Sequence, residues 1–292
     1  MIFTIWFERR IRSQNVKDFS FWGNGTIDFS SKLNKKIKVH IKIETGMARV
    51  GVLYEESVDF IKKVGKLKNI KIIGLVSHFA TTEESNQYFA NFQLDNFNRL
   101  IETLEGENIF IPIKHIASSA AITLSQKNHF DAVRLGIAMY GLWPSQENKS
   151  IIRRRYPWFN LYPVLSWKTK LFQIKKVQAD TPIGYGCAYR TKKAIKIGLI
   201  PVGYFEGLDR GFSNNGYVLV GGKKCSIIGR VCMNITIIDL NNVKNAKVGD
   251  DVVLIGKQGK SQINVDYLAS KIDTINYEII TRLSDNIIRI LK

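Results

Sequence analysis

The sequence has few cysteines and no long apolar run. Its 292 residues include three cysteines, Cys187, Cys225 and Cys232, whose spacing fits neither a disulfide framework nor a paired metal site. We interpret them as small buried side chains in a reducing compartment. No apolar run approaches the ~20 residues that cross a bilayer, so no contact with a membrane is expected.

The first residues also lack the features of a secretory signal. The apolar stretch in residues 1–7 is too short for a signal core, and no basic stretch precedes it. These absences predict a cytoplasmic protein.

Acidic residues are too few to balance the basic ones, and the formal net charge is +18. Such a balance is typical of proteins that bind nucleic acid or membrane surfaces. The lysines here are scattered, however, and no aromatic-flanked basic stripe or nucleic-acid motif is present. We favour a background bias toward Lys, Ile and Asn, and we keep an RNA-associated protein as the least favoured hypothesis. We interpret Arg153, Arg154 and Arg155 as part of a solvated linker.

Periodicity predicts two domains of different class, α/β followed by all-β. In the first, short apolar strands alternate with amphipathic helices, which indicates parallel βαβ units. We expect strands at 39–43, 72–78, 111–117 and 132–137, and helices at 57–67 and around 89–104. Four such units make about half of a (β/α)8 barrel, which typically needs ~250 residues.

The alternation of strands and helices stops after residue 144. We assign 1–36 to no element, 37–144 to the partial barrel, 145–162 to a linker and 163–292 to a β-rich domain. In that domain we expect strands at 165–177, 195–202, 217–220, 226–240 and 251–255, a helix at 265–274 and a final strand. Gly221 and Gly222 predict a hairpin turn.

Lys42 lies inside an apolar strand, and Arg49 follows the end of that strand. Active sites in these barrels gather at the carboxyl ends of the strands. A buried lysine must be paired, neutralised or modified, although a lysine that reaches out to solvent fits this pattern as well.

The surrounding string carries a family resemblance. Residues 42–51 read K-I-E-T-G-M-A-R-V-G, which resembles a segment of the alanine racemases, enzymes that use pyridoxal phosphate. The resemblance implies that Lys42 carries a carbamate. It implies that Arg49 contacts the cofactor's phenolic oxygen and the substrate.

Three more strings follow in the family's order. They read S-H-F-A-T at 77–81, A-S-S-A-A at 117–121 and V-R-L-G-I-A-M-Y-G-L at 133–142. The resemblance implies that His78 stacks on the pyridine ring and that Arg134 faces its nitrogen. It also implies that Ser119 and the backbone N–H groups of Gly136 and Ile137 bind phosphate. Because arginine stays protonated, the ring becomes a weaker electron sink, which suits racemisation. Ser118 replaces the family's usual asparagine.

The β-rich half holds the remaining strings. G-Y-G at 184–186 resembles the segment whose tyrosine, here Tyr185, is the base that acts on L-alanine. The P-V-G-Y string ending at Tyr204, with Arg210 after it, resembles an element at the active-site entrance. G-R-V-C-M-N at 229–234 contains Arg230, a supporting residue, and Met233, implied to touch substrate through its backbone.

Two features complete the comparison within that half. Asn234 replaces the family's aspartate. In I-N-Y-E at 275–278, Tyr277 is implied to contact phosphate or to line the entrance. Together the ordered strings cover about residues 37–292.

The family's cofactor lysine belongs to a string like K-A-N-A-Y-G-H-G, which these 292 residues do not contain. In the family this lysine is also the second base. We therefore expect an alanine racemase for peptidoglycan synthesis, a homodimer that is truncated or inactive as given. The alternative is a non-catalytic remnant that at most binds phosphate ligands or a partner chain.

Overall fold

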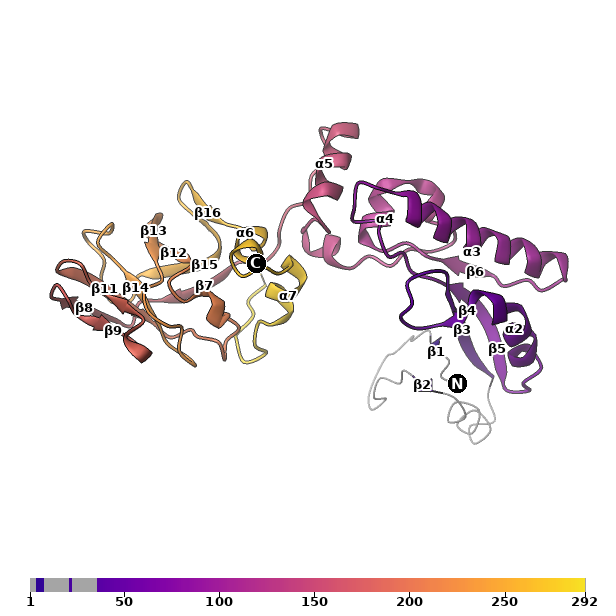
Figure 1. Ribbon diagram of the computed structural model, residues 1–292, viewed down its shortest axis with the longest axis horizontal. Coiled ribbons are helices and arrows are strands. Elements are labelled where there is room, and N and C mark those ends of the chain that lie inside the picture. Colours follow the sequence, from indigo (N-terminus) through magenta and orange to yellow (C-terminus); the bar gives the residue numbers. More distant parts are fainter. Residues whose placement is uncertain (1–3, 8–20, 23–35, 292) are drawn as a thin grey trace. The chain divides into compact units, whose positions relative to one another are not determined.

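The computed structural model describes residues 4–7, 21–22 and 36–291. The chain divides into two compact units between Pro163 and Val164 (Figure 1). An α/β domain with a parallel sheet is followed by a β-rich domain, which confirms the predicted fold class. Among the described helices, none combines the length and apolar content that crossing a membrane requires.

The first unit contains a parallel sheet with helices packed on it. Strands β3, β5 and β6 are parallel neighbours, while β1 pairs antiparallel with β3. Its strands are β1 (Thr4–Phe7), β2 (Phe21–Trp22), β3 (Ile37–Glu44), β4 (Val52–Leu53), β5 (Ile70–Val76) and β6 (Ile113–His115). Its helices are α2 (Ser57–Gly65), α3 (Tyr88–Gly106), α4 (Ser119–Leu124) and α5 (Gln146–Arg155), with 3₁₀ turns η1 (Tyr54–Glu56), η2 (Gln126–Asn128) and η3 (Ile137–Tyr140).

One core cluster joins the strands to the helices. Ile41 of β3 and Phe97 of α3 are fully buried, and Ile61 of α2 packs in the same cluster. These side chains recur at the strand period of two and the helix period of 3.6, as the sequence indicated. The cluster fixes the carboxyl ends of β3, β5 and β6 along one edge.

One prediction for this unit is wrong. Residues 132–137 do not form a strand, because their backbone donates a single hydrogen bond to the segment after β6, from Arg134 N–H to Ala117 O at 3.0 Å, and one bond makes no ladder. The expected linker contains helix α5, whose start is capped by the Ser145 hydroxyl accepting the N–H of Asn148 at 2.9 Å.

The second unit consists of antiparallel sheets. Its strands are β7 (Trp167–Lys170), β8 (Gln173–Val177), β9 (Pro182–Ile183), β10 (Tyr189–Arg190), β11 (Ile195–Ile200), β12 (Tyr217–Val220), β13 (Lys223–Ser226), β14 (Thr236–Asp239), β15 (Asp251–Gln258) and β16 (Ser261–Ile263). Its helices are α6 (Val265–Lys271) and α7 (Asn276–Thr281), with 3₁₀ turns η4 (Tyr185–Cys187) and η5 (Arg210–Phe212).

The predicted glycine hairpin is confirmed. Val220 pairs with Lys223, and Gly221 and Gly222 both have positive φ, as a two-residue primed turn requires. Other expectations for this unit are wrong. Residues 229–235 interrupt the expected 226–240 strand as a loop, and the expected final strand is helix α7. Local apolar content could not distinguish that short helix from a strand.

Candidate functional site

The loop after β3 is shaped by Glu44. Its carboxylate accepts the N–H of Gly46 at 2.7 Å and that of Arg49 at 3.0 Å, and it also accepts the N–H of Met47. Burial acts to raise the pKa of Glu44, but the N–H groups from Arg49 to Gly46 outweigh it and lower the pKa below its usual value. The carboxylate therefore closes a tight loop that places Arg49 at the strand end.

Lys42 lies at this edge and is only 6% exposed. Burial, followed by the positive charges of Arg49 and Arg134, lowers the pKa of its amine to about 8. A larger fraction of this amine is therefore neutral and nucleophilic at neutral pH than of an exposed lysine.

Buried Gln93 of α3 holds the segment after β5. Its side-chain N–H donates to His78 O at 3.0 Å, and its oxygen accepts the N–H of Ala80 at 2.8 Å. On the strand side, the Ser77 hydroxyl donates to Ile43 O at 2.9 Å. These contacts fix His78 at the carboxyl edge of the sheet.

Arg134 binds the ends of two strands at once. One guanidinium nitrogen donates to His115 Nδ1 at 2.6 Å and to His115 O at 3.3 Å. The other donates to Ser77 O at 2.7 Å, His78 Nδ1 at 2.9 Å and Ile116 O at 3.0 Å. Burial and the nearby Arg49 lower the pKa of Arg134 to about 10, so it stays charged at neutral pH.

Both histidines that Arg134 contacts are neutral at neutral pH. Burial, then the charge of Arg134, lowers the pKa of His78 to about 4. The same two causes lower the pKa of His115 to about 4. The edge thus gathers cations with neutral rings, an environment that suits an anionic ligand.

Ser119 gathers backbone N–H groups at the start of α4. Its hydroxyl accepts the N–H of Gly136 at 2.9 Å and that of Ala138 at 3.4 Å. Ile137 is buried between them. A hydroxyl beside converging N–H groups is the donor set that phosphate prefers.

In the second unit, Tyr185 is displayed on a turn. Gly184 and Gly186 flank it with φ of 69° and 67°, and its side chain is 72% exposed. A Cβ at Gly186 would lie 2.8 Å from a guanidinium nitrogen of Arg230, so that guanidinium packs against the turn. Glycine is required there by both the conformation and the space.

The loop of Met233 packs against the loop of Tyr204. Tyr204 N–H donates to Cys232 O at 3.1 Å, and Phe205 N–H donates to Met233 O at 2.8 Å. Asn214 joins the loop to the Tyr185 turn, since it accepts the N–H of Gly229 at 2.6 Å and donates to Ala188 O at 3.0 Å.

Arg210 and Tyr277 lie on linked elements of the same unit. Arg282, one residue beyond α7, forms ion pairs with Asp209 at 2.5 Å and with Glu278 at 2.6 Å. A hollow of about 290 Å³ is lined by Tyr204, Gly207, Asp209, Arg210 and Arg282. Tyr277 is half-buried on α7.

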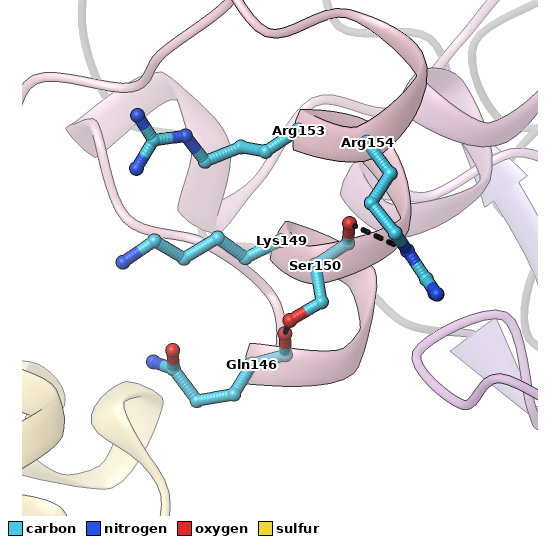
Figure 2. Close-up of a pocket in the computed structure, with 5 residues that line it drawn as sticks. All are labelled: Gln146, Lys149, Ser150, Arg153 and Arg154. Atoms are coloured by element: carbon cyan, nitrogen blue, oxygen red, sulfur yellow. Dashed lines mark hydrogen bonds between the residues drawn. The ribbon is translucent and has the colours of Figure 1, made fainter.

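Figure 2 shows a second hollow, along helix α5. It is open and is lined by Gln146, Lys149, Ser150, Arg153 and Arg154. The three arginines predicted to lie in a linker form the last turn of this helix, where positive charge complements the helix dipole. None of the predicted site residues lines this hollow.

The structure therefore brings the predicted residues together in two groups. Lys42, Arg49, His78, Ser119, Arg134 and Gly136 gather in the first unit, and Tyr185, Tyr204, Arg230 and Met233 gather in the second. Sequence reasoning missed His115, His40 and Gln93. A histidine just before the A-S-S-A-A string was the available signal for His115.

Comparison with known proteins gives two family matches. The model of "Alanine racemase, N-terminal domain" matches residues 25–144, and that of "Alanine racemase, C-terminal domain" matches residues 164–291. The first match begins before residue 37, where the sequence motifs had placed the resemblance. Residues 25–35 lie outside the described part.

Individual alanine racemases are similar in sequence to most of this chain. Alanine racemase of Halothermothrix orenii is 45% identical over 89% of this chain and 67% of its own length. That of Leptospira interrogans is 41% identical over 96% of this chain and 73% of its own length.

Solved structures agree as well. Alanine racemase of Bacillus anthracis with bound L-Ala-P superposes with a TM-score of 0.80 at 36% identity, over 88% of this chain and 66% of that one. Alanine racemase of Clostridium difficile in complex with cycloserine superposes with a TM-score of 0.78 at 31% identity, over 88% of this chain and 64% of that one. The chain thus spans about two thirds of the length of these relatives.

Proposed function

Because this chain belongs to the alanine racemase family, we propose that it forms the larger part of a pyridoxal-phosphate-dependent enzyme that interconverts L- and D-alanine. The observation that carries the proposal is Arg134, a charged guanidinium fixed by His78, His115 and strand-end carbonyls beside the Ser119 hydroxyl. The reaction would supply D-alanine for peptidoglycan in the cytoplasm.

The hydrogen-bond donors of the first unit fit both the phosphate and the pyridine ring of pyridoxal phosphate. Ser119 and the N–H groups of Gly136 and Ile137 would hold the phosphate, with Tyr277 as a further ligand. Arg134 would face the ring nitrogen, and His78 would stack on the ring. When bound, the cofactor would withdraw electrons from the amino acid and acidify the proton on its α-carbon.

Arg134 would keep its own proton throughout. A guanidinium with a pKa of about 10 gives up a proton far less readily than a neutral-pH acid does. Arg134 would thus donate a hydrogen bond and leave the ring nitrogen unprotonated. This limits how much charge the ring accepts and keeps the reaction to proton removal and return.

Tyr185 would exchange the α-proton on one face of the substrate. Its phenol is exposed on a glycine turn, with the Arg230 guanidinium packed against that turn. The backbone of Met233 would contact the substrate, and Tyr204 and Arg210 would line the entrance. As in the family, we propose a homodimer in which these groups serve the partner's barrel.

Lys42 would act as a carbamate rather than as a cation. Its buried amine has a pKa of about 8 beside Arg49 and Arg134, so the neutral amine needed to react with carbon dioxide is available. The resulting anion would lie between two guanidinium groups and hold Arg49 toward the substrate. The carbamate would also relieve the repulsion among the three cations.

The second base and the covalent anchor would come from a lysine in a segment that matches no string in these 292 residues. The experiment mixes the purified chain with a polypeptide containing the amino-terminal third of the Halothermothrix orenii relative. D-alanine formation from L-alanine is then measured with added pyridoxal phosphate. We expect activity in the mixture and none with either piece alone.

Two controls make the result decisive. Tyr185→Phe in the mixture should remove the activity without preventing association. If the wild-type pieces associate, bind pyridoxal phosphate and still form no D-alanine, the proposal fails and the non-catalytic remnant is favoured. Activity of the chain alone, with an absorption band lost on borohydride reduction, would instead place the lysine within these residues.

A further inference from the structure

His40 lies behind the site, on β3, and reaches Arg134 through a second ring. Its Nδ1 lies 2.9 Å from Nε2 of His115, and Nδ1 of His115 lies 2.6 Å from the guanidinium of Arg134. The two rings meet edge to face, with centroids 5.0 Å apart. Three side chains from separate segments thus form one continuous line of hydrogen bonds.

The direction of every hydrogen bond in this line is determined. Arginine only donates, so Nδ1 of His115 must accept and carry no proton. The neutral ring then carries its proton on Nε2 and donates it to His40. Nδ1 of His40 must accept in turn, so that ring carries its proton on Nε2. A single tautomer of each ring is compatible with the geometry.

The sheet makes room for this arrangement. A Cβ at Gly74 would lie 2.1 Å from Nδ1 of His40, so only glycine lets the ring cross β5. The register between β3 and β5 shifts between Val39 and His40 and places Gly74 opposite His40. The bulge and the glycine let the ring lie over β5 and reach His115 on β6.

We propose that His40 is a positioning residue for Arg134, acting through the ring of His115. Its lone pair at Nδ1 holds the Nε2 proton of His115 and so keeps Nδ1 of His115 turned toward the guanidinium. Of the charged and titratable groups, the Arg134 guanidinium and the His40 ring are the two that act electrostatically on His115. This positioning role rests on the proposed function only for the role of Arg134, and the hydrogen bonds belong to this chain alone.

The test records ring-nitrogen signals of the full chain labelled with ¹⁵N-histidine at pH 7. The sequence has four histidines, so all rings can be assigned by single substitutions. We expect a pyridine-type signal for Nδ1 of His115 and of His40, and a pyrrole-type signal for Nε2 of His115. A proton on Nδ1 of His115 in the wild-type spectrum would overturn the proposal.

Two substitutions separate positioning from packing. His40→Asn offers an oxygen where Nδ1 lay, so we expect His115 to keep its wild-type signals. His40→Leu fills similar space without an acceptor, so we expect both His115 nitrogens to move toward tautomer-averaged values. His129, whose Nε2 contacts Ile122 O at 2.9 Å, serves as the internal control.

The outcome does not depend on racemase activity. If His40→Leu leaves His115 in its wild-type tautomer, His40 has no positioning role, even if the chain proves to be a racemase. If His40→Leu does not fold, the comparison of wild type with His40→Asn decides, since loss of the His115 tautomer in His40→Asn contradicts acceptance by residue 40.

Discussion

The Glu44 carboxylate accepts the backbone N–H of Arg49 at 3.0 Å, so an acidic side chain fixes a cationic one through the main chain. The same carboxylate accepts the N–H of Gly46 at 2.7 Å. A loop closed in this way keeps one shape without any buried apolar side chain of its own. The position of Arg49 is therefore sensitive to a residue that need not touch a ligand.

Glu44→Ala should lower the free energy of unfolding by roughly 1–3 kcal/mol, because several N–H groups lose a charged acceptor. Glu44→Gln keeps one oxygen acceptor and should lose less. Urea unfolding at pH 7 measures both. Glu55→Ala, on an exposed turn, is the control and should change stability by less than about 0.5 kcal/mol. Equal losses in all three variants would contradict this role.

Stability should fall as the pH is lowered from about 6.5 toward 4. The folded-state pKa of His78 and of His115 is about 4, below the ordinary value of 6.5, so the unfolded chain takes up these protons first. The two neutral histidines contribute their full stability above about pH 6.5. This contribution to the free energy of unfolding, roughly 1–3 kcal/mol in total, is lost as the pH falls toward 4. His115→Asn should flatten this dependence in urea titrations. His129→Asn should leave it unchanged.

Lys42→Met should stabilise the chain at pH 7 by roughly 1–2 kcal/mol when carbon dioxide is excluded, since a cation is removed from a buried cationic site. The pKa of Lys42 is about 8 in the folded chain, and its ordinary value is 10.5. Below about pH 8 the buried amine is charged, so its destabilisation of the fold is then at its largest. It disappears as the pH rises to about 10.5. The two proteins should therefore converge in stability at high pH.

Added bicarbonate should reduce the stability difference between wild type and Lys42→Met at pH 7, because a carbamate replaces the cation of Lys42. A ¹³C signal from labelled bicarbonate should appear in the wild type and be missing from Lys42→Met. Lys62→Met, at an exposed ion pair with Glu107, is the control and should leave the signal in place.

Tyr185→Phe should reduce the turnover of the complemented enzyme by at least ~10²-fold, the usual effect of removing a general base. The midpoint of unfolding should stay unchanged, since the ring is 72% exposed. Tyr189→Phe is the matched control four residues along and should keep full turnover. A Tyr185→Phe mixture that turns over normally would remove Tyr185 from the reaction.

Phe97→Ala should lower the free energy of unfolding by roughly 3–5 kcal/mol, because removal of a fully buried ring leaves a cavity between α3 and the sheet. Phe92→Ala, on the exposed side of the same helix, should cost far less. Circular dichroism during urea unfolding distinguishes the two.

The fold class could be predicted from the sequence, and so could the places of the candidate site residues, because each motif lies at or near the end of a regular element. Lys42 lies two residues before the end of a period-two strand, and Ser119 opens a helix. The 132–137 segment was wrongly predicted to be a strand because Val133 and Leu135 look strand-like, yet they are 43% and 46% exposed and their backbone lacks a ladder. Apolar composition does not say whether a neighbouring strand is present.

His40 and Gln93 could not be predicted for a different reason. A histidine or glutamine inside an element has no local signature for a partner 75 or 15 residues away. The distant partners come together only through the register of β3 on β5 and the packing of α3. Gly74, a glycine inside a strand, was the one local sign of close approach.

All four histidines belong to the first unit, and none follows Pro163. Between about pH 6.5 and 5, where histidines take up more protons than carboxylates do, acid therefore acts mainly on one half of the polypeptide. In a calorimeter, the melting of the two halves should separate as the solution is acidified, with the histidine-bearing half moving to lower temperature. The protein then carries an internal reference against which protonation of that half can be measured.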